Sequence, residues 1–161
     1  MASKSCWQTP IKSLTIALTS LTLLAQGMSH LAVGEISRVA GKRGAAVESR
    51  IAVSVQPGFH VNSNTPNEDY LIPLKVKWTA LGALEGGQVV YPKPSQEKYD
   101  FAEKPLSVFT GTFNLVAHFK VAPNAPAGPG AAVGKLTYQA CNSTTCFPPK
   151  TVDITVPYSV E

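Results

Sequence analysis

Hydrophobic and polar residues alternate along much of the chain after residue 45. The cleanest run extends from Phe113 to Val121, where every second residue is apolar. Because successive side chains of a strand point to opposite faces, a period of two predicts a strand with one buried face. Similar runs lie at 46–55, 74–79, 135–141 and 151–156, and short extended segments are expected at 59–61 and 88–91.

Turn-forming residues separate these runs, and no stretch after residue 35 has the 3.6-residue period of an amphipathic helix. Pro57-Gly58 predicts a tight turn, and residues 62–69 and 123–130 have the composition of connections. Short strands separated in this way are typical of an antiparallel β-sandwich. We expect one all-β domain over residues 46–161, preceded at 28–45 by a loose lead-in whose one candidate element is an edge strand.

The first 27 residues have a different pattern, which predicts a cleavable signal peptide. Lys4 and Lys12 precede an apolar run that ends in the small residues around Ala25. The run covers residues 14–25, well short of the ~20 residues that span a bilayer as a helix. Since no second long apolar run follows, we expect a periplasmic or secreted protein with no membrane span in the mature chain.

Composition and charge exclude several classes of protein. Hydrophobic residues make up 44% of the 161 residues and charged residues 15%, which is too apolar for a disordered chain. The net charge of +4 is mild and the sequence has no basic cluster, so a nucleic-acid partner is not expected. Lys and Pro on the predicted edge strands favour a monomer.

Two of the three cysteines carry the candidate chemistry, since Cys6 lies within the predicted signal peptide. Cys141 and Cys146 belong to the segment YQACNSTTCFPP, residues 138–149. If the four residues between them close a hairpin, their Cα atoms should lie ~4.5–5.5 Å apart, within the ~4.4–6.8 Å that a disulfide tolerates. A bridge that closes so short a loop stabilises a fold weakly, which favours reversible exchange. A lone pair in a secreted β-domain is also commonly structural, so a static bridge stays open as the alternative.

A metal site is not expected, and no cofactor is implied. His30, His60 and His118 are scattered and lack the paired spacing of zinc ligands. His118 falls on the outward face of its predicted strand, and His60 lies in a short strand next to a turn. Neither is assigned a functional role from the sequence.

The segment YQACNSTTCFPP resembles the cysteine-bearing hairpin of the N-terminal, periplasmic domain of the thiol:disulfide interchange protein DsbD. In that family a Tyr-Gln-x-Cys strand, a short loop and a Cys-aromatic-Pro-Pro sequence occur together. The segments GFHVNSNTPNEDYLIP (58–73) and YPKPSQEKYDFAEKPLSVFTG (91–111) are also similar. The resemblance runs in order across residues 45–160.

The resemblance implies an immunoglobulin-like sandwich with a redox-active cysteine pair, which would perform protein-disulfide reductase-type thiol exchange. Cys141 and Cys146 would receive electrons from a membrane-embedded thiol donor of the DsbD type. They would pass these electrons to thioredoxin-like periplasmic proteins. Cys146 would be the attacking thiol. Because residues 1–161 include neither a membrane electron conduit nor a thioredoxin-like domain, we expect the donor to be a separate protein.

The resemblance also implies a cap loop over the cysteine pair. Phe101 occupies the position of the shielding ring, and the carboxylates of Asp100 and Glu103 would raise the pKa of a nearby thiol. Tyr138 is expected to pack into the core. The spacing of four residues between the cysteines departs from the five of the best-known members. The alternative function is therefore a non-catalytic immunoglobulin-like binding or scaffold domain with a static disulfide.

Overall fold

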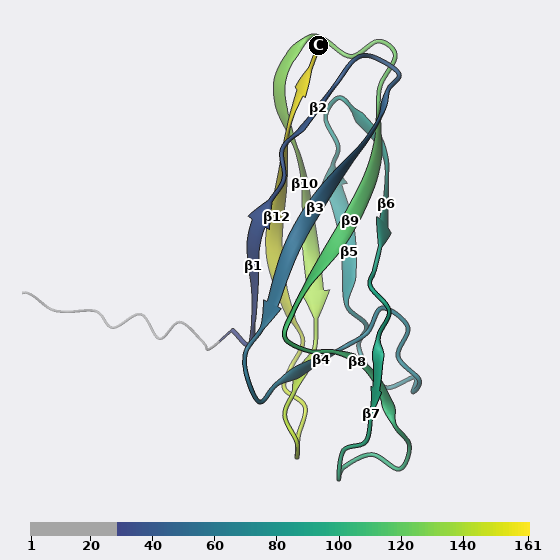
Figure 1. Cartoon of the computed structure of the whole chain (residues 1–161), viewed down its shortest axis with the longest axis vertical. Coiled ribbons are helices and arrows are strands. Elements are labelled where there is room, and N and C mark those ends of the chain that lie inside the picture. The colour runs from purple at the N-terminus through teal and green to yellow at the C-terminus, as the bar shows by residue number, and fades with distance from the viewer. Residues whose placement is uncertain (1–28) are drawn as a thin grey trace, which may run out of the picture.

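The computed structural model describes residues 29–161, which form twelve β-strands and no helix. The predicted signal peptide, residues 1–27, lies outside the described residues. Within 29–161 there is accordingly no helix with the length and apolarity needed to cross a membrane. Two long sheets run side by side along the molecule, and a third, smaller sheet lies at the end away from the C-terminus (Figure 1).

Each sheet has four strands. The first has the order β1 (Leu31–Ile36), β3 (Ala46–Val55), β9 (Thr112–Val121), β6 (Leu84–Val90). The second has the order β2 (Val39–Gly41), β12 (Lys150–Val160), β10 (Gly128–Tyr138), β5 (Lys75–Ala80). The third has the order β11 (Ala140–Cys141), β4 (His60–Asn62), β8 (Leu106–Phe109), β7 (Ser95–Glu97).

The core lies between the two long sheets and confirms the alternation seen in the sequence. Ile51 of β3 and Leu115 of β9 face inward from one sheet, and Leu136 of β10 and Ile154 of β12 face inward from the other; none is more than 1% exposed. All long-strand pairings are antiparallel apart from β2 with β12. The predicted all-β, immunoglobulin-like antiparallel sandwich is confirmed.

Four strands lie where the alternation gave no signal. The segment 28–45, expected as a loose lead-in with one candidate edge strand, contributes two strands, β1 on β3 and β2 on β12. Few of its residues are fully buried, and a bulge between Val33 and Ile36 interrupts the period. All four residues of β8 are buried and β7 has three residues, so neither alternates. Strand β10 also begins inside the predicted connection 123–130.

The third sheet positions the cysteine hairpin. A turn from Gln56 to Phe59 leads from β3 of the first sheet into β4, and it is closed by a hydrogen bond from the Phe59 N–H to the Gln56 carbonyl of 3.1 Å. Pro57 and Gly58, with a φ of 82° at Gly58, give the residue pattern of a type II turn. The predicted Pro-Gly turn is thus confirmed. It brings β4 beside β11, the strand that carries Cys141.

Candidate functional site

Cys141 and Cys146 form a disulfide at the tip of a hairpin between β10 and β12. Their sulfurs are 1.99 Å apart and their Cα atoms 3.9 Å apart, closer than the distance expected from the sequence. Hydrogen bonds flank the pair on both sides, from the Asn142 N–H to the Thr145 carbonyl (2.9 Å) and from the Phe147 N–H to the Ala140 carbonyl (2.8 Å). The cysteines are thus a non-hydrogen-bonded antiparallel pair, the kind in which Cα atoms approach most closely.

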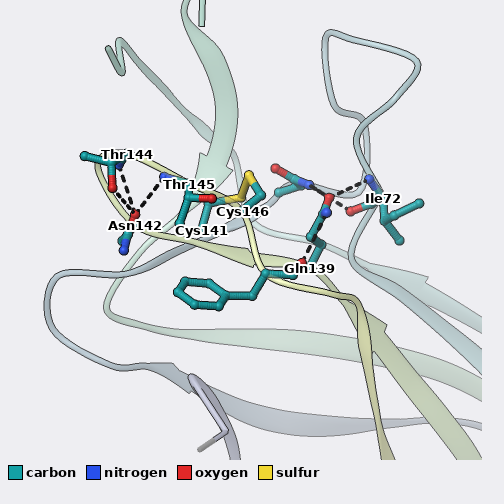
Figure 2. The surroundings of a disulfide bond; sticks show 9 residues. Ile72, Gln139, Cys141, Asn142, Thr144, Thr145 and Cys146 are labelled. Carbon is teal, nitrogen blue, oxygen red and sulfur yellow. Dashed lines mark hydrogen bonds between the residues drawn. A yellow bond between two sulfur atoms is a disulfide. The ribbon is translucent and has the colours of Figure 1, made fainter. Parts of the chain in front are cut away.

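The loop between the cysteines is held by one side chain. The carboxamide oxygen Oδ1 of Asn142 accepts hydrogen bonds from the backbone N–H groups of Thr144 (2.9 Å) and Thr145 (2.8 Å), and from the Thr144 hydroxyl (3.1 Å) (Figure 2). An Asn side chain that bonds the backbone two residues on is a turn former. The loop is therefore closed by hydrogen bonds among its own residues.

The two cysteines differ in exposure. Cys141 is 0% exposed, whereas Cys146 is partly exposed. Disulfide exchange requires a thiolate to reach one sulfur of the bridge. Cys146 is accordingly the more accessible of the two cysteines.

Gln139 joins the hairpin to the third sheet. Its side-chain oxygen Oε1 accepts hydrogen bonds from the Asn62 amide (3.0 Å) and from the Ile72 N–H (3.1 Å), and its Nε2 donates to the Phe147 carbonyl (3.3 Å) (Figure 2). The Asn62 amide also donates to the Ile72 carbonyl, at 3.0 Å. One Gln side chain thus connects the residue after Cys146 to β4 and to the loop before β5.

His60 lies directly across from the disulfide strand, since β11 pairs with β4 with Cys141 opposite His60. The imidazole is 2% exposed and stacks on the ring of Tyr99, with centroids 3.9 Å apart. Its Nε2 is buried and has no hydrogen-bond partner. Sequence reasoning missed both His60 and Tyr99, because neither belongs to a spaced motif.

The electrostatics of this group keep the imidazole neutral. Burial lowers the pKa of His60 from 6.5 to about 4, and the negative charge of Glu97 offsets this only in part. The Tyr99 hydroxyl donates to Glu97 Oε2 at 2.8 Å. Burial, followed by this bond and the Glu97 charge, raises the pKa of Tyr99 well above its usual value.

The predicted cap residues lie next to this stack. The Phe101 ring is 5.7 Å from Tyr99 and 6.4 Å from His60, nearly parallel to both. It packs, with Tyr99, against a small separate core made of Leu71, Ala102, Leu106 and Val108. Asp100 and Glu103 are exposed in the same turn. The structure therefore brings Phe101 near the cysteine strand through His60 and Tyr99, while the effect of the two carboxylates on the thiols stays a prediction.

A pocket of about 530 Å³ opens beside the hairpin. Its lining includes His60, Glu97 and Tyr99, the turn residue Pro57, and Ser143 from the loop between the cysteines. Within residues 29–161, no three side chains of His, Cys, Asp or Glu are grouped so as to hold a metal ion. His118 is exposed on β9, 3.9 Å from Glu48, and lies on the surface as predicted.

Comparison with known proteins gives a family for this arrangement. The family model described as the N-terminal region of the thiol:disulfide interchange protein DsbD matches residues 29–157. The chain belongs to the DsbD N-terminal family. This confirms the resemblance drawn from the cysteine hairpin.

A solved structure shows the same fold. The N-terminal periplasmic domain of ScsB from Proteus mirabilis is similar with a TM-score of 0.58 and 16% identity. The match covers 84% of this chain and 48% of the ScsB chain, so this chain spans about half of that structure. The reduced DsbD N-terminal domain of Neisseria meningitidis has 20% identity over 77% of this chain and 85% of its own, with a TM-score of 0.45. The comparison with curated proteins gave no match.

The structure explains the Tyr-Gln-x-Cys pattern in this member of the DsbD N-terminal family. Tyr138 is 1% exposed in the core, as predicted, and its hydroxyl lies 2.9 Å from the Ser29 hydroxyl. Gln139 points to the other face and makes the bonds described above. Tyr138 thus fixes the strand to the sandwich, and Gln139 fixes the hairpin to β4.

Replacing Gln139 by Ala should lower the free energy of unfolding by about 1–3 kcal/mol, because it removes the acceptor of the buried Asn62 amide and the bonds to Ile72 and Phe147. Urea unfolding of the oxidised protein measures this. Gln88→Ala, an exposed residue that makes none of these bonds, is the matched control and should change stability by under about 0.5 kcal/mol. Equal stability of the two variants would contradict the connecting role of Gln139.

The depressed pKa of His60 also predicts a pH dependence of stability. An unfolded histidine takes up a proton below pH 6.5, whereas the folded His60 resists until about pH 4. The contribution of His60 to the free energy of unfolding is therefore fully present above pH 6.5, and it falls by about 3 kcal/mol as the pH drops to 4. His60→Phe should lose this component in urea unfolding at a series of pH values. The exposed His118→Phe control should keep it, and parallel curves for wild type and His60→Phe would refute a buried neutral imidazole.

Proposed function

We propose that this protein is a periplasmic thiol–disulfide exchange module that carries electrons through Cys141 and Cys146. The donor is a membrane-embedded thiol protein of the DsbD type, and the acceptors are thioredoxin-like periplasmic proteins. The observation that carries the proposal is the disulfide at the tip of a hairpin, with one cysteine buried and the other partly exposed. Membership of the DsbD N-terminal family supports the choice of partners.

The exchange is a pair of thiolate attacks. A donor thiolate attacks Sγ of Cys146, the bond between the two protein sulfurs breaks, and Cys141 leaves with the electron pair. A second donor thiol then attacks the mixed disulfide, which oxidises the donor to a disulfide and releases Cys146. The pair gains two electrons and two protons. The reverse sequence, begun by Cys146, reduces an acceptor disulfide.

The way the hairpin is held supports exchange over a static bridge. The covalent loop contains four residues between the cysteines, and closing so short a loop removes little entropy from the unfolded chain. The hairpin is independently fixed by the Gln139 hydrogen bonds and by the Asn142 turn. The fold therefore has little need of the bridge, and the bridge can open without loss of the surrounding structure.

The difference in exposure predicts unequal reactivity of the two cysteines. In a Cys6→Ser background, Cys141→Ser leaves the partly exposed Cys146 free, and Cys146→Ser leaves the buried Cys141 free. With glutathione disulfide, intact mass should show mixed-disulfide formation at least about tenfold faster for Cys141→Ser, because exchange rate depends on access. The same order is expected with an oxidised thioredoxin. Equal rates, or faster reaction of Cys141, would refute attack at Cys146.

The cap hypothesis predicts that Phe101→Ala speeds reduction of the bridge by a small thiol. An aromatic pair contributes ~0.5–1.5 kcal/mol, so loss of the Phe101 ring from its stack should favour opening of the site about fivefold. The rate with dithiothreitol, followed by alkylation and mass, measures this. Tyr70→Ala, which removes a ring that is 66% exposed, is the control and should react like wild type. An unchanged rate in Phe101→Ala would show that the ring does not shield the pair.

A further inference from the structure

His60 has a polar atom that the oxidised structure leaves unused. Its Nε2 is buried and has no hydrogen-bond partner, and His60 as a whole is only 2% exposed, so water does not reach the nitrogen. An unsatisfied buried polar atom costs ~1–3 kcal/mol, so such atoms in native proteins call for a physical explanation. Stacking on Tyr99 accounts for the ring but not for the nitrogen.

The strand register shows which group faces this imidazole. Gln139 and Asn62 are on the same face of the β4–β11 ribbon, because their side chains share a 3.0 Å hydrogen bond. Cys141 lies two residues after Gln139, and His60 lies two residues before Asn62. Cys141 and His60 are directly opposite one another and therefore on that same face. Directly opposed side chains in an antiparallel pair have Cβ atoms ~4.5–5.5 Å apart. The sulfur of Cys141 is thus the cross-strand neighbour of the imidazole.

We propose that His60 is a positioning residue for the exchange reaction: when the disulfide opens, its Nε2 accepts a hydrogen bond from the Cys141 thiol. This inference rests on the proposed function and specifies the state of the buried cysteine. In the disulfide, Cys141 has no proton to donate and the nitrogen stays without a partner. In the dithiol, one new hydrogen bond satisfies both groups, so His60 favours the reduced form.

The groups around the imidazole keep this pair neutral. Among residues 29–161, Glu97 from β7 is the charged group that acts on His60, and its carboxylate also accepts a hydrogen bond from the Tyr99 hydroxyl. The lowered pKa of His60 supports a neutral ring, which accepts a bond from a thiol rather than holding a thiolate as an imidazolium would. In the reduced protein, Cys141 is thereby kept as a protonated thiol. Attack is left to Cys146, the cysteine that partners reach.

The proton balance of the first step follows. As a donor thiolate forms a bond to Cys146 Sγ, Cys141 departs as a thiolate and takes up one proton from solvent in the pocket that His60 lines. The resulting thiol donates to His60 Nε2. In the reverse direction this thiol returns its proton to solvent, Cys141 attacks the mixed disulfide at Cys146, and the partner leaves as a thiolate.

The test compares His60→Phe, His60→Gln and the exposed control His118→Phe in glutathione buffers at pH 7. Phe keeps an aromatic ring against Tyr99 but offers no acceptor, whereas the Gln carboxamide places a polar atom near the position of Nε2. The dithiol-to-disulfide ratio, trapped by alkylation, should fall about tenfold in His60→Phe, which equals ~30 mV for a two-electron couple. His60→Gln should recover most of this, and His118→Phe should match wild type. Equal ratios in all four proteins would overturn the inference.

A second measurement does not depend on exchange with a partner. In wild type, the imidazole nitrogen chemical shift of His60 should change when the protein is reduced chemically, and the change should be absent in Cys141→Ala but imitated by Cys141→Ser, which supplies a hydroxyl donor. If the imidazole nitrogen chemical shift of His60 is the same in the oxidised and reduced protein, the hydrogen bond is refuted. If wild type itself fails to equilibrate with glutathione, the proposed function is refuted, whereas normal exchange without a His60 effect refutes this inference alone.

Discussion

The antiparallel pairing of β11 with β4 is the constraint on which the site depends. These are short strands, and their register is held by the side chains of Gln139 and Asn62 rather than by a long ladder. A slip of one residue would move Cys141 to the other face and remove it from His60. The same bonds fix the hairpin that places Cys146 at the surface.

This register gives the disulfide two unlike sides. On one side His60, Tyr99 and Phe101 form a stack of rings that continues into the small core under β8. On the other, the preceding residue Phe59 stacks on His30 at 3.9 Å, and Phe147 lies 4.8 Å from His30. The buried cysteine thus lies between two groups of aromatic side chains. Burial of this kind favours a thiol over a thiolate, which supports the proposed difference between the two sulfurs.

The sequence predicted those parts of the fold in which one face is buried. Strands β3, β9, β10 and β12 alternate because each contributes one face to the core, whereas β8 is buried on all four residues and has no period to detect. The cysteine pair and its hairpin were predictable because their partners are close in sequence. His60 was not, since its significance comes from a register with Cys141, which lies far along the chain. The signal that existed was its place in a short strand after a Pro-Gly turn.

The central claim is that the bridge opens while the sandwich stays folded, and reduction by thioredoxin under native conditions tests it most directly. The oxidised protein is incubated with reduced thioredoxin and alkylated, and its intact mass is measured by mass spectrometry. Circular dichroism follows the β-structure in parallel. The account predicts that Cys141 and Cys146 both become alkylated as the β-sheet signal persists. A pair that is alkylated only after denaturant has unfolded the domain would show a static bridge and contradict the account.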